Sequence, residues 1–168
     1  IFCALGMLRD GFSGHITIVE KGLSIERRTC PRIESGHCLH CEPCRITTGF
    51  SGAGAFSDGK LSLSHEVGGD LPALLGADLI QQTIGRVDKM YLDFGADAHV
   101  EGVGHPNEVA QIRRRAIQAG LKLVDCPIRH LGTEKAQELY GRIEEHLKQA
   151  GVELLFECEC REILIESE

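Results

Sequence analysis

Apolar residues recur at helical spacing in four parts of the chain, and this pattern predicts four helices. They cover residues 1–9, 78–94, 106–119 and 134–150. Thr133 directly precedes the last of them, where a hydroxyl side chain can cap free backbone N–H groups. This helix has the clearest inner face, a stripe that consists of Ala136, Leu139, Ile143 and Leu147.

Runs of β-branched and apolar residues between these helices predict strands. The run at 15–21 is typical of a buried parallel strand, and further strands are predicted at 121–126, 152–156 and 161–166. Residues 22–64 lack this periodicity and are expected to form a loop with short ordered pieces. Helices interleaved with strands indicate the α/β class.

Composition and charge exclude some classes of function. The chain has 168 residues, of which 42% are apolar and 26% charged, as in an ordinary soluble globular protein. Its formal net charge of -7 argues against a nucleic-acid surface, which is normally basic. No apolar run approaches the roughly 20 residues of a membrane span. No export signal is visible, so the eight cysteines are expected to be reduced thiols or ligands in the cytoplasm.

Four cysteines, Cys30, Cys38, Cys41 and Cys44, lie directly before a glycine-rich loop. Four soft thiolate ligands suit zinc or an iron–sulfur cluster. The two-residue gaps among the last three also allow a redox-active disulfide, and a third interpretation leaves the thiols unliganded. These three interpretations stay open. The other cysteines are expected to be buried small apolar residues: Cys3, Cys126, Cys158 and Cys160.

The loop that follows has four glycines between residues 49 and 59, interspersed with small polar residues. Such a loop lets backbone N–H groups come close to a phosphate or a flat ring. A P-loop is a poor match, because Leu61 follows Lys60 where a P-loop has Ser or Thr. A merely flexible loop is the plainer alternative, but Phe50 and Phe56 within it indicate packing.

Glu20 lies at the end of the strand predicted at 15–21, after a helix. In a dinucleotide-binding unit, an acid at this position accepts hydrogen bonds from the ribose hydroxyls, about 20 residues after a glycine fingerprint. Counting back from Glu20 puts that fingerprint at or before Ile1. The alternative is an ordinary exposed glutamate at a strand end.

Three parts of the chain together resemble the family of uncharacterised FAD-dependent dehydrogenases, which belong to the glutathione-reductase-type FAD/NAD(P)-binding flavoproteins. These parts are IFCAL with ITIVEKG, then GFSGAGAFSDGKLSLS, then HLGTEKA with AGVELLF. The resemblance implies a Rossmann-like α/β fold that is incomplete at both ends, because the GxGxxG fingerprint and the later segment that closes the flavin pocket are missing. The start at Ile1 instead of Met agrees with a piece of a longer protein.

The resemblance also implies a division of the chain. Residues 1–64 would be part of the FAD-binding domain, with the Cys/Gly-rich loop. Residues 65–130 would be a mainly helical inserted segment. Residues 131–168 would return to the FAD domain as a helix and a strand pair.

By the same resemblance, Glu20 would bind the adenosine ribose, with Lys21 beside it among the cofactor-binding residues. Cys160 would lie near the adenine, and His130 and Thr133 would face a substrate cavity. The part of the site from the phosphates to the flavin would be lined by Gly52, Ala53, Gly54, Ser57, Asp58 and Lys60.

The expected function is that of an FAD-dependent oxidoreductase, in which the flavin moves a hydride or electrons. Its substrate or electron carrier is not identified by the sequence, NAD(P)H is a candidate electron donor, and no residue stands out as an acid–base catalyst. The alternative function is a metal- or iron–sulfur-binding module that uses Cys30, Cys38, Cys41 and Cys44.

Overall fold

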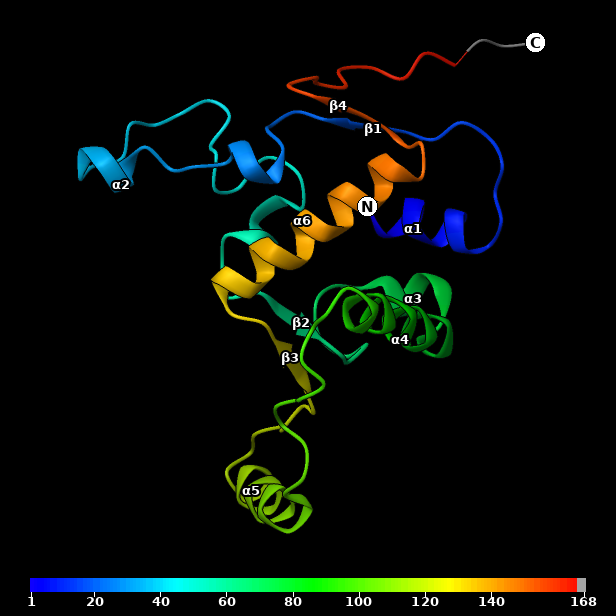
Figure 1. Ribbon diagram of the computed structural model, residues 1–168. Helices are drawn as coiled ribbons and strands as arrows, with labels where there is room; N and C mark the ends of the chain where they lie inside the picture. Colours follow the sequence, from blue (N-terminus) through cyan, green and yellow to red (C-terminus); the bar gives the residue numbers. More distant parts are fainter. Residues whose placement is uncertain (166–168) are drawn as a thin grey trace. The chain divides into compact units, whose positions relative to one another are not determined.

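The structure is a computed structural model that describes residues 1–165, and the chain forms two compact units (Figure 1). The first unit consists of Ile1–Gly59 together with the chain from Thr133 onward, and the second consists of Lys60–Gly132. Each unit combines helices with a two-stranded sheet, so the protein is of mixed α/β type.

The sheet of the first unit is a parallel strand pair. β1 (Thr17–Glu20) pairs with β4 (Glu153–Phe156), and Glu20 lies opposite Phe156 in the register. Parallel strands need a crossover connection, and here the pair joins two segments from near the opposite ends of the sequence (Figure 1). The strands predicted at 15–21 and 152–156 are confirmed, but the predicted burial of the first is wrong, since Thr17 and Val19 are exposed and Ile18 and Glu20 are half-buried.

The core of the first unit lies along α6 (Thr133–Gln149). The helix contacts two short 3₁₀ turns, η1 (Ile25–Arg27) and η2 (Gly52–Ala55). A buried glutamate, Glu144, accepts a hydrogen bond from the backbone N–H of Ile25 at 2.9 Å. The predicted inner face is confirmed, since four of its side chains are at most 2% exposed: Ala136, Leu139, Ile143 and Leu147.

The second unit pairs β2 (Lys60–Ser62) with β3 (Ile128–His130) in antiparallel fashion. Its helices are α3 (Leu71–Leu75), α4 (Ala77–Asp93) and α5 (Pro106–Gln118). The sequence pattern correctly predicted α4 and α5, and also α1 (Phe2–Arg9) of the first unit. None of the helices among the described residues is long and apolar enough to cross a membrane.

A buried arginine connects the strand pair of the second unit to α4. Arg129 of β3 is almost fully buried, and its guanidinium forms an ion pair with Asp88 of α4, with Nη2 and Oδ2 at 2.8 Å. This side-chain hydrogen bond with Asp88 raises the pKa of Arg129. Asp88 therefore provides the opposite charge that the buried guanidinium of Arg129 requires.

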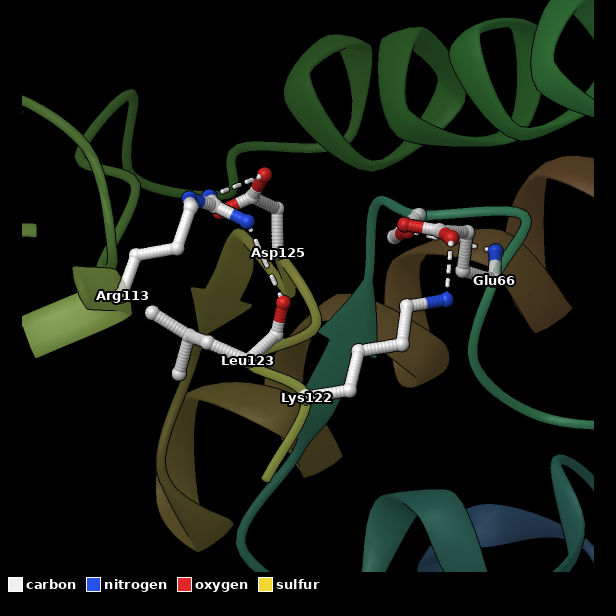
Figure 2. Close-up of polar contacts among 6 residues, drawn as sticks. Glu66, Arg113, Lys122, Leu123 and Asp125 are labelled. Atoms are coloured by element: carbon white, nitrogen blue, oxygen red, sulfur yellow. Dashed lines mark hydrogen bonds and ion pairs between the residues drawn. The ribbon is translucent and has the colours of Figure 1, made fainter. Parts of the chain in front are cut away.

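The strand predicted at 121–126 is wrong, because this segment follows an irregular path after α5. Figure 2 shows that contacts of side chains, and not a ladder of backbone hydrogen bonds, fix the position of this segment. Arg113 contacts both carboxylate oxygens of Asp125 at 2.6 and 2.8 Å and the carbonyl of Leu123 at 3.2 Å, while Lys122 lies 3.4 Å from Glu66. An alternating sequence becomes a strand only where a neighbouring strand completes its hydrogen bonds.

The strand predicted at 161–166 is also wrong over residues 161–165, which have no regular structure. Ile163, Leu164 and Ile165 are 79–91% exposed, so their apolar side chains contact little of the described chain. The physical reason is again the missing strand partner. Residue 166 of this prediction lies outside the described residues.

Candidate functional site

A cavity of about 660 Å³ lies in the first unit, where the carboxyl ends of β1 and β4 meet the cysteine-rich loop. Its volume falls within the roughly 300–1,000 Å³ of small-molecule sites. Residues 21–23 after β1 and Glu157 after β4 line one side. The other lining residues come from the η1 region and the cysteine-rich loop: Glu26, Arg27, Thr29, Cys41, Glu42, Pro43, Arg45 and Thr48.

Glu20 is the last residue of β1, and its carboxylate is bonded to a residue that lines this cavity, although Glu20 itself does not line it. Oε1 accepts a hydrogen bond from the backbone N–H of Gly22 at 2.7 Å. Two more backbone bonds extend the strand contact past the sheet, from Glu157 to the carbonyl of Gly22 at 3.0 Å and from Cys158 to that of Glu20 at 3.1 Å. The predicted ribose acid therefore lies directly before the residues that line the cavity.

Two glycines let the glycine-rich loop lie against the end of β1. A Cβ atom on Gly22 would stand only 2.5 Å from the backbone nitrogen of Gly49, a contact that no side chain can make. Leu23 and Gly49 form a β-bridge, and the backbone N–H of Phe50 donates to the carbonyl of Leu23 at 2.9 Å. Gly49 also has φ of +128°, which favours glycine.

Arg28 holds this loop from within. Arg28 is buried, with only 3% of its surface exposed. The central carbon of its guanidinium lies 4.2 Å from the centre of the Phe56 ring, over its face. Burial lowers the pKa of Arg28, while the nearby Glu20 opposes that shift. The guanidinium donates hydrogen bonds of 2.6–2.9 Å to four backbone carbonyls of the loop, those of Arg45, Ile46, Phe50 and Gly52.

No sequence pattern marked Arg28 as a site residue. It lies in a polar, non-periodic stretch, where an arginine normally faces solvent. The only available signal was indirect, since a long loop without periodicity needs some group to satisfy its backbone carbonyls.

The glycine-rich loop contains a polar group without a partner. Ser51 has φ of +71°, and within the described residues its buried hydroxyl oxygen has no hydrogen-bond partner. Gly52 follows with φ of +59° and with open space where a side chain would point, whereas Gly54 faces the hydroxyl of Tyr140. The open space at Gly52 leaves room for a ligand to come close to the loop backbone.

Glu157 has a strained backbone at the cavity wall. Its φ is +58°, and a left-handed conformation costs a non-glycine residue about 1–2 kcal/mol. Its carboxylate lies 3.0 Å from the guanidinium of Arg27, but both side chains are more than half exposed. Exposed ion pairs contribute about 0–1 kcal/mol, so this pair does not offset the strain.

The four cysteines of the proposed metal site do not form one cluster. Cys41 lines the cavity, Cys30 is half-buried, and Cys38 and Cys44 are exposed on either side of Cys41 in the loop that follows α2 (Arg32–Ser35). Within residues 1–165, no three side chains of His, Cys, Asp or Glu gather as they would around a metal ion.

Two of these sulfurs nevertheless accept backbone hydrogen bonds. Cys38 Sγ accepts the N–H of His40 at 3.4 Å. The N–H groups of Thr47 and Ile46, and then the Thr47 hydroxyl, lower the pKa of the Cys44 thiol. The loop therefore favours a negative charge on Cys44.

Three of the remaining cysteines contradict the expectation of burial. Cys3, Cys158 and Cys160 are exposed, and Cys126 is half-buried with its sulfur 3.4 Å from the hydroxyl of Ser62. Cys158 and Cys160 also follow β4 instead of lying in strands. Cys158 and Cys160 would be buried only if a second layer of structure covered them, but the chain has already left the sheet at these positions.

The other predicted site residues fall into both units. In the first unit, Lys21 lines the cavity and pairs with Glu159 at 2.6 Å. Ser57 and Asp58 are exposed after η2, and Thr133 opens α6 while its hydroxyl donates to the carbonyl of Ser57 at 2.7 Å.

In the second unit, Lys60 lies opposite His130 in the β2–β3 pair. His130 Nδ1 lies 3.4 Å from Glu101 Oε1. A β-bridge with Ile128 fixes the backbone of Glu101 beside it.

We expect Arg28→Lys to release the loop, because an ammonium group cannot reach four carbonyls and would leave several of them buried and unpaired. The free energy of unfolding should fall by at least about 3 kcal/mol in urea titrations. Trypsin should also cleave after Arg45 faster than in the unchanged protein. Arg27→Lys is the matched control, expected to change stability by less than about 1 kcal/mol. Equal cleavage rates for Arg28→Lys and the unchanged protein would contradict this role.

The lowered pKa of Cys44 predicts a distinct pH profile for its alkylation. A lower pKa leaves more thiolate at a given pH, so iodoacetamide should modify Cys44 at lower pH than the exposed Cys158 of the same chain. Mass spectrometry of the digested protein measures both sites in one sample. Thr47→Val removes the hydroxyl donor and should move the Cys44 profile to higher pH. One common profile for both cysteines would show that the loop does not activate Cys44.

Comparison with protein-family models, curated proteins and solved structures finds no match to this chain. The candidate site is therefore defined only by the contacts of its own residues.

Proposed function

We propose that this chain is part of an FAD-dependent oxidoreductase. The observation that supports it best is Glu20, a carboxylate fixed at the end of a parallel strand beside a cavity of about 660 Å³. Ligands of open α/β sheets bind outside the carboxyl ends of the strands, and an acid there accepts the ribose hydroxyls of a dinucleotide. In this proposal, β1 and β4 belong to a larger Rossmann-like sheet of the glutathione-reductase type.

The glycine-rich loop suits the rest of an FAD molecule. The open space at Gly52 would let a phosphate or a flat ring come close to the loop backbone. When bound, FAD would supply the transfer of a hydride or electrons. The protein would bind and orient it through the residues predicted from the sequence: Glu20, Lys21, Gly52, Ala53, Gly54, Ser57, Asp58, Lys60 and Cys160.

Two further residues are proposed to face the substrate, His130 and Thr133. The contact between His130 Nδ1 and Glu101 would fix the orientation of the imidazole ring. The substrate is a small molecule or an electron carrier, with NAD(P)H as a candidate donor. All eight cysteines are free thiols, which favours a reducing compartment such as the cytoplasm.

We expect the full-length protein to contain about one FAD per chain, measured from its visible spectrum and from the cofactor released on denaturation. Glu20→Gln should weaken FAD binding about 10- to 100-fold, because a neutral amide accepts hydrogen bonds from ribose less strongly than a carboxylate. Glu26→Gln, which alters another acid of the same cavity, is the matched control and should keep the affinity. A colourless protein that takes up no FAD would refute the proposal.

The backbone N–H bonds to the sulfurs of Cys38 and Cys44 favour a second candidate function, a metal or iron–sulfur site. Hydrogen bonds to sulfur stabilise thiolates and tune clusters in such sites. The cysteine-rich loop would have to gather its thiols around the metal, since no three candidate ligands are close together in residues 1–165. A cluster would then pass electrons to or from the flavin.

Anaerobic purification followed by iron, zinc and sulfide analysis tests this second function. A bound cluster or zinc ion should be present in stoichiometric amount and should be lost in both Cys38→Ala and Cys41→Ala. Cys158→Ala is the control, because this exposed thiol lies outside the cysteine-rich loop. Metal that is absent, or unaffected by the first two substitutions, excludes the site.

A further inference from the structure

Four leucines at the start of the helix pair α3–α4 in the second unit face solvent. Three of them lie three or four positions apart on α3 and so share one face, and α3 packs against α4, which contributes the fourth (Figure 1). Single exposed leucines are common, whereas a group of them marks an interaction site. This leucine patch consists of side chains that are 51–78% exposed: Leu71, Leu74, Leu75 and Leu79.

A hollow of about 180 Å³ borders the leucine patch. Leu71 and Pro72 of α3 line it together with Ile80 and Ile84 of α4. At protein interfaces, the side chains that contribute most to binding fill pockets of this kind on the partner. The partner of the leucine patch is therefore expected to present an exposed apolar side chain.

Negative charge flanks the leucine patch. Asp70 directly precedes α3, Asp78 lies in the first turn of α4, and both are exposed. The sequence contains no lysine or arginine from residue 64 to residue 85. These acids disfavour the anionic surface of a membrane. They favour a partner whose surface is both apolar and basic, because complementary charges select the partner of an interface.

Helix α5 of the same unit has an apolar and basic surface of this kind. None of its residues is buried. Ile117 is 66% exposed and follows Arg114 by three positions, so both lie on one face of the helix. Arg113 forms an ion pair with Asp125, but Arg114 forms none within the part of the chain that the structure describes. The sequence has no acid from residue 109 to residue 124.

We propose that two copies of this chain form a two-fold symmetric dimer, in which the leucine patch of each copy docks on α5 of the other. Ile117 of one copy fills the hollow beside the leucine patch of its partner, and Arg114 lies close to the acids that flank this patch. A two-fold axis repeats each contact, so both exposed surfaces of each copy become covered at once. The inference goes beyond the proposed function, since it does not depend on a cofactor.

Sedimentation velocity of the full-length protein at several concentrations tests the dimer. We expect a dimer, and Leu74→Gln should raise its dissociation constant at least about 10-fold, because the substitution acts at both contacts. Leu74 is 78% exposed, so the melting temperature should not change. Ile33→Gln is the matched control, an equally exposed apolar residue of the first unit that should leave the dimer intact. A monomer at all concentrations, or a dimer that Leu74→Gln leaves unchanged, overturns the inference.

Reversed charges test which surfaces meet. Asp78→Lys and Arg114→Glu each place like charges together at both contacts, and each variant alone should dimerise at least about 10-fold more weakly. In a mixed dimer of the two variants, the reversed charges face each other at one contact and the original charges meet at the other. Mixing the two variants should therefore restore the dimer.

Lys135→Glu, a charge reversal at an exposed position of α6 in the first unit, is the control and should leave the dimer intact. A mixture of Asp78→Lys and Arg114→Glu that stays monomeric overturns the pairing of the leucine patch with α5. Particles larger than a dimer in the unchanged protein would indicate head-to-tail association and would overturn the two-fold arrangement.

Discussion

The hydrogen bonds of the buried Arg28 guanidinium are the interaction on which the candidate site depends. The segment between β1 and η2 is long and has almost no backbone ladder of its own, so its carbonyls need other partners. Arg28 gives them one planar cation with several donors, and the carbonyl dipoles in turn replace the water that a buried charge loses. These hydrogen bonds fix the loop beside the strand ends, where it forms one wall of the cavity.

Because of this arrangement, the thiols and the glycines belong to one loop with two chemical surfaces. Close packing of Gly22 against Gly49 directs the glycine-rich part to the end of β1, next to Glu20. The preceding part contributes Cys41 to the cavity and exposes the sulfurs of Cys38 and Cys44. The cavity and the exposed thiols are therefore neighbouring surfaces of the first unit, and Cys41 belongs to both the cysteine-rich loop and the cavity lining.

Elements with a strong local period could be predicted from the sequence, and those that need a distant partner could not. The inner face of α6 follows from its own apolar spacing, and β1 follows from a compact β-branched run. The segments 121–126 and 161–165 have similar alternation but no neighbouring strand, so they remain irregular. In the second unit, the ion pair of Arg129 with Asp88 joins residues 41 positions apart, and no local pattern marks such a pair.

The sequence by itself determined α1, α4, α5 and α6, but not the short α2 and α3, and it determined where the glycine-rich loop lies and that an acid ends the first strand. These features depend on neighbours within a few positions. Tertiary structure alone decided that Arg28 is buried, that Cys158 and Cys160 are exposed and that Glu157 adopts a left-handed backbone beside Arg27. Burial and partners of a side chain depend on segments that meet only after folding. Glu157 is separated from Arg27 by 130 positions, and only the parallel pairing of β1 with β4 brings them to one cavity.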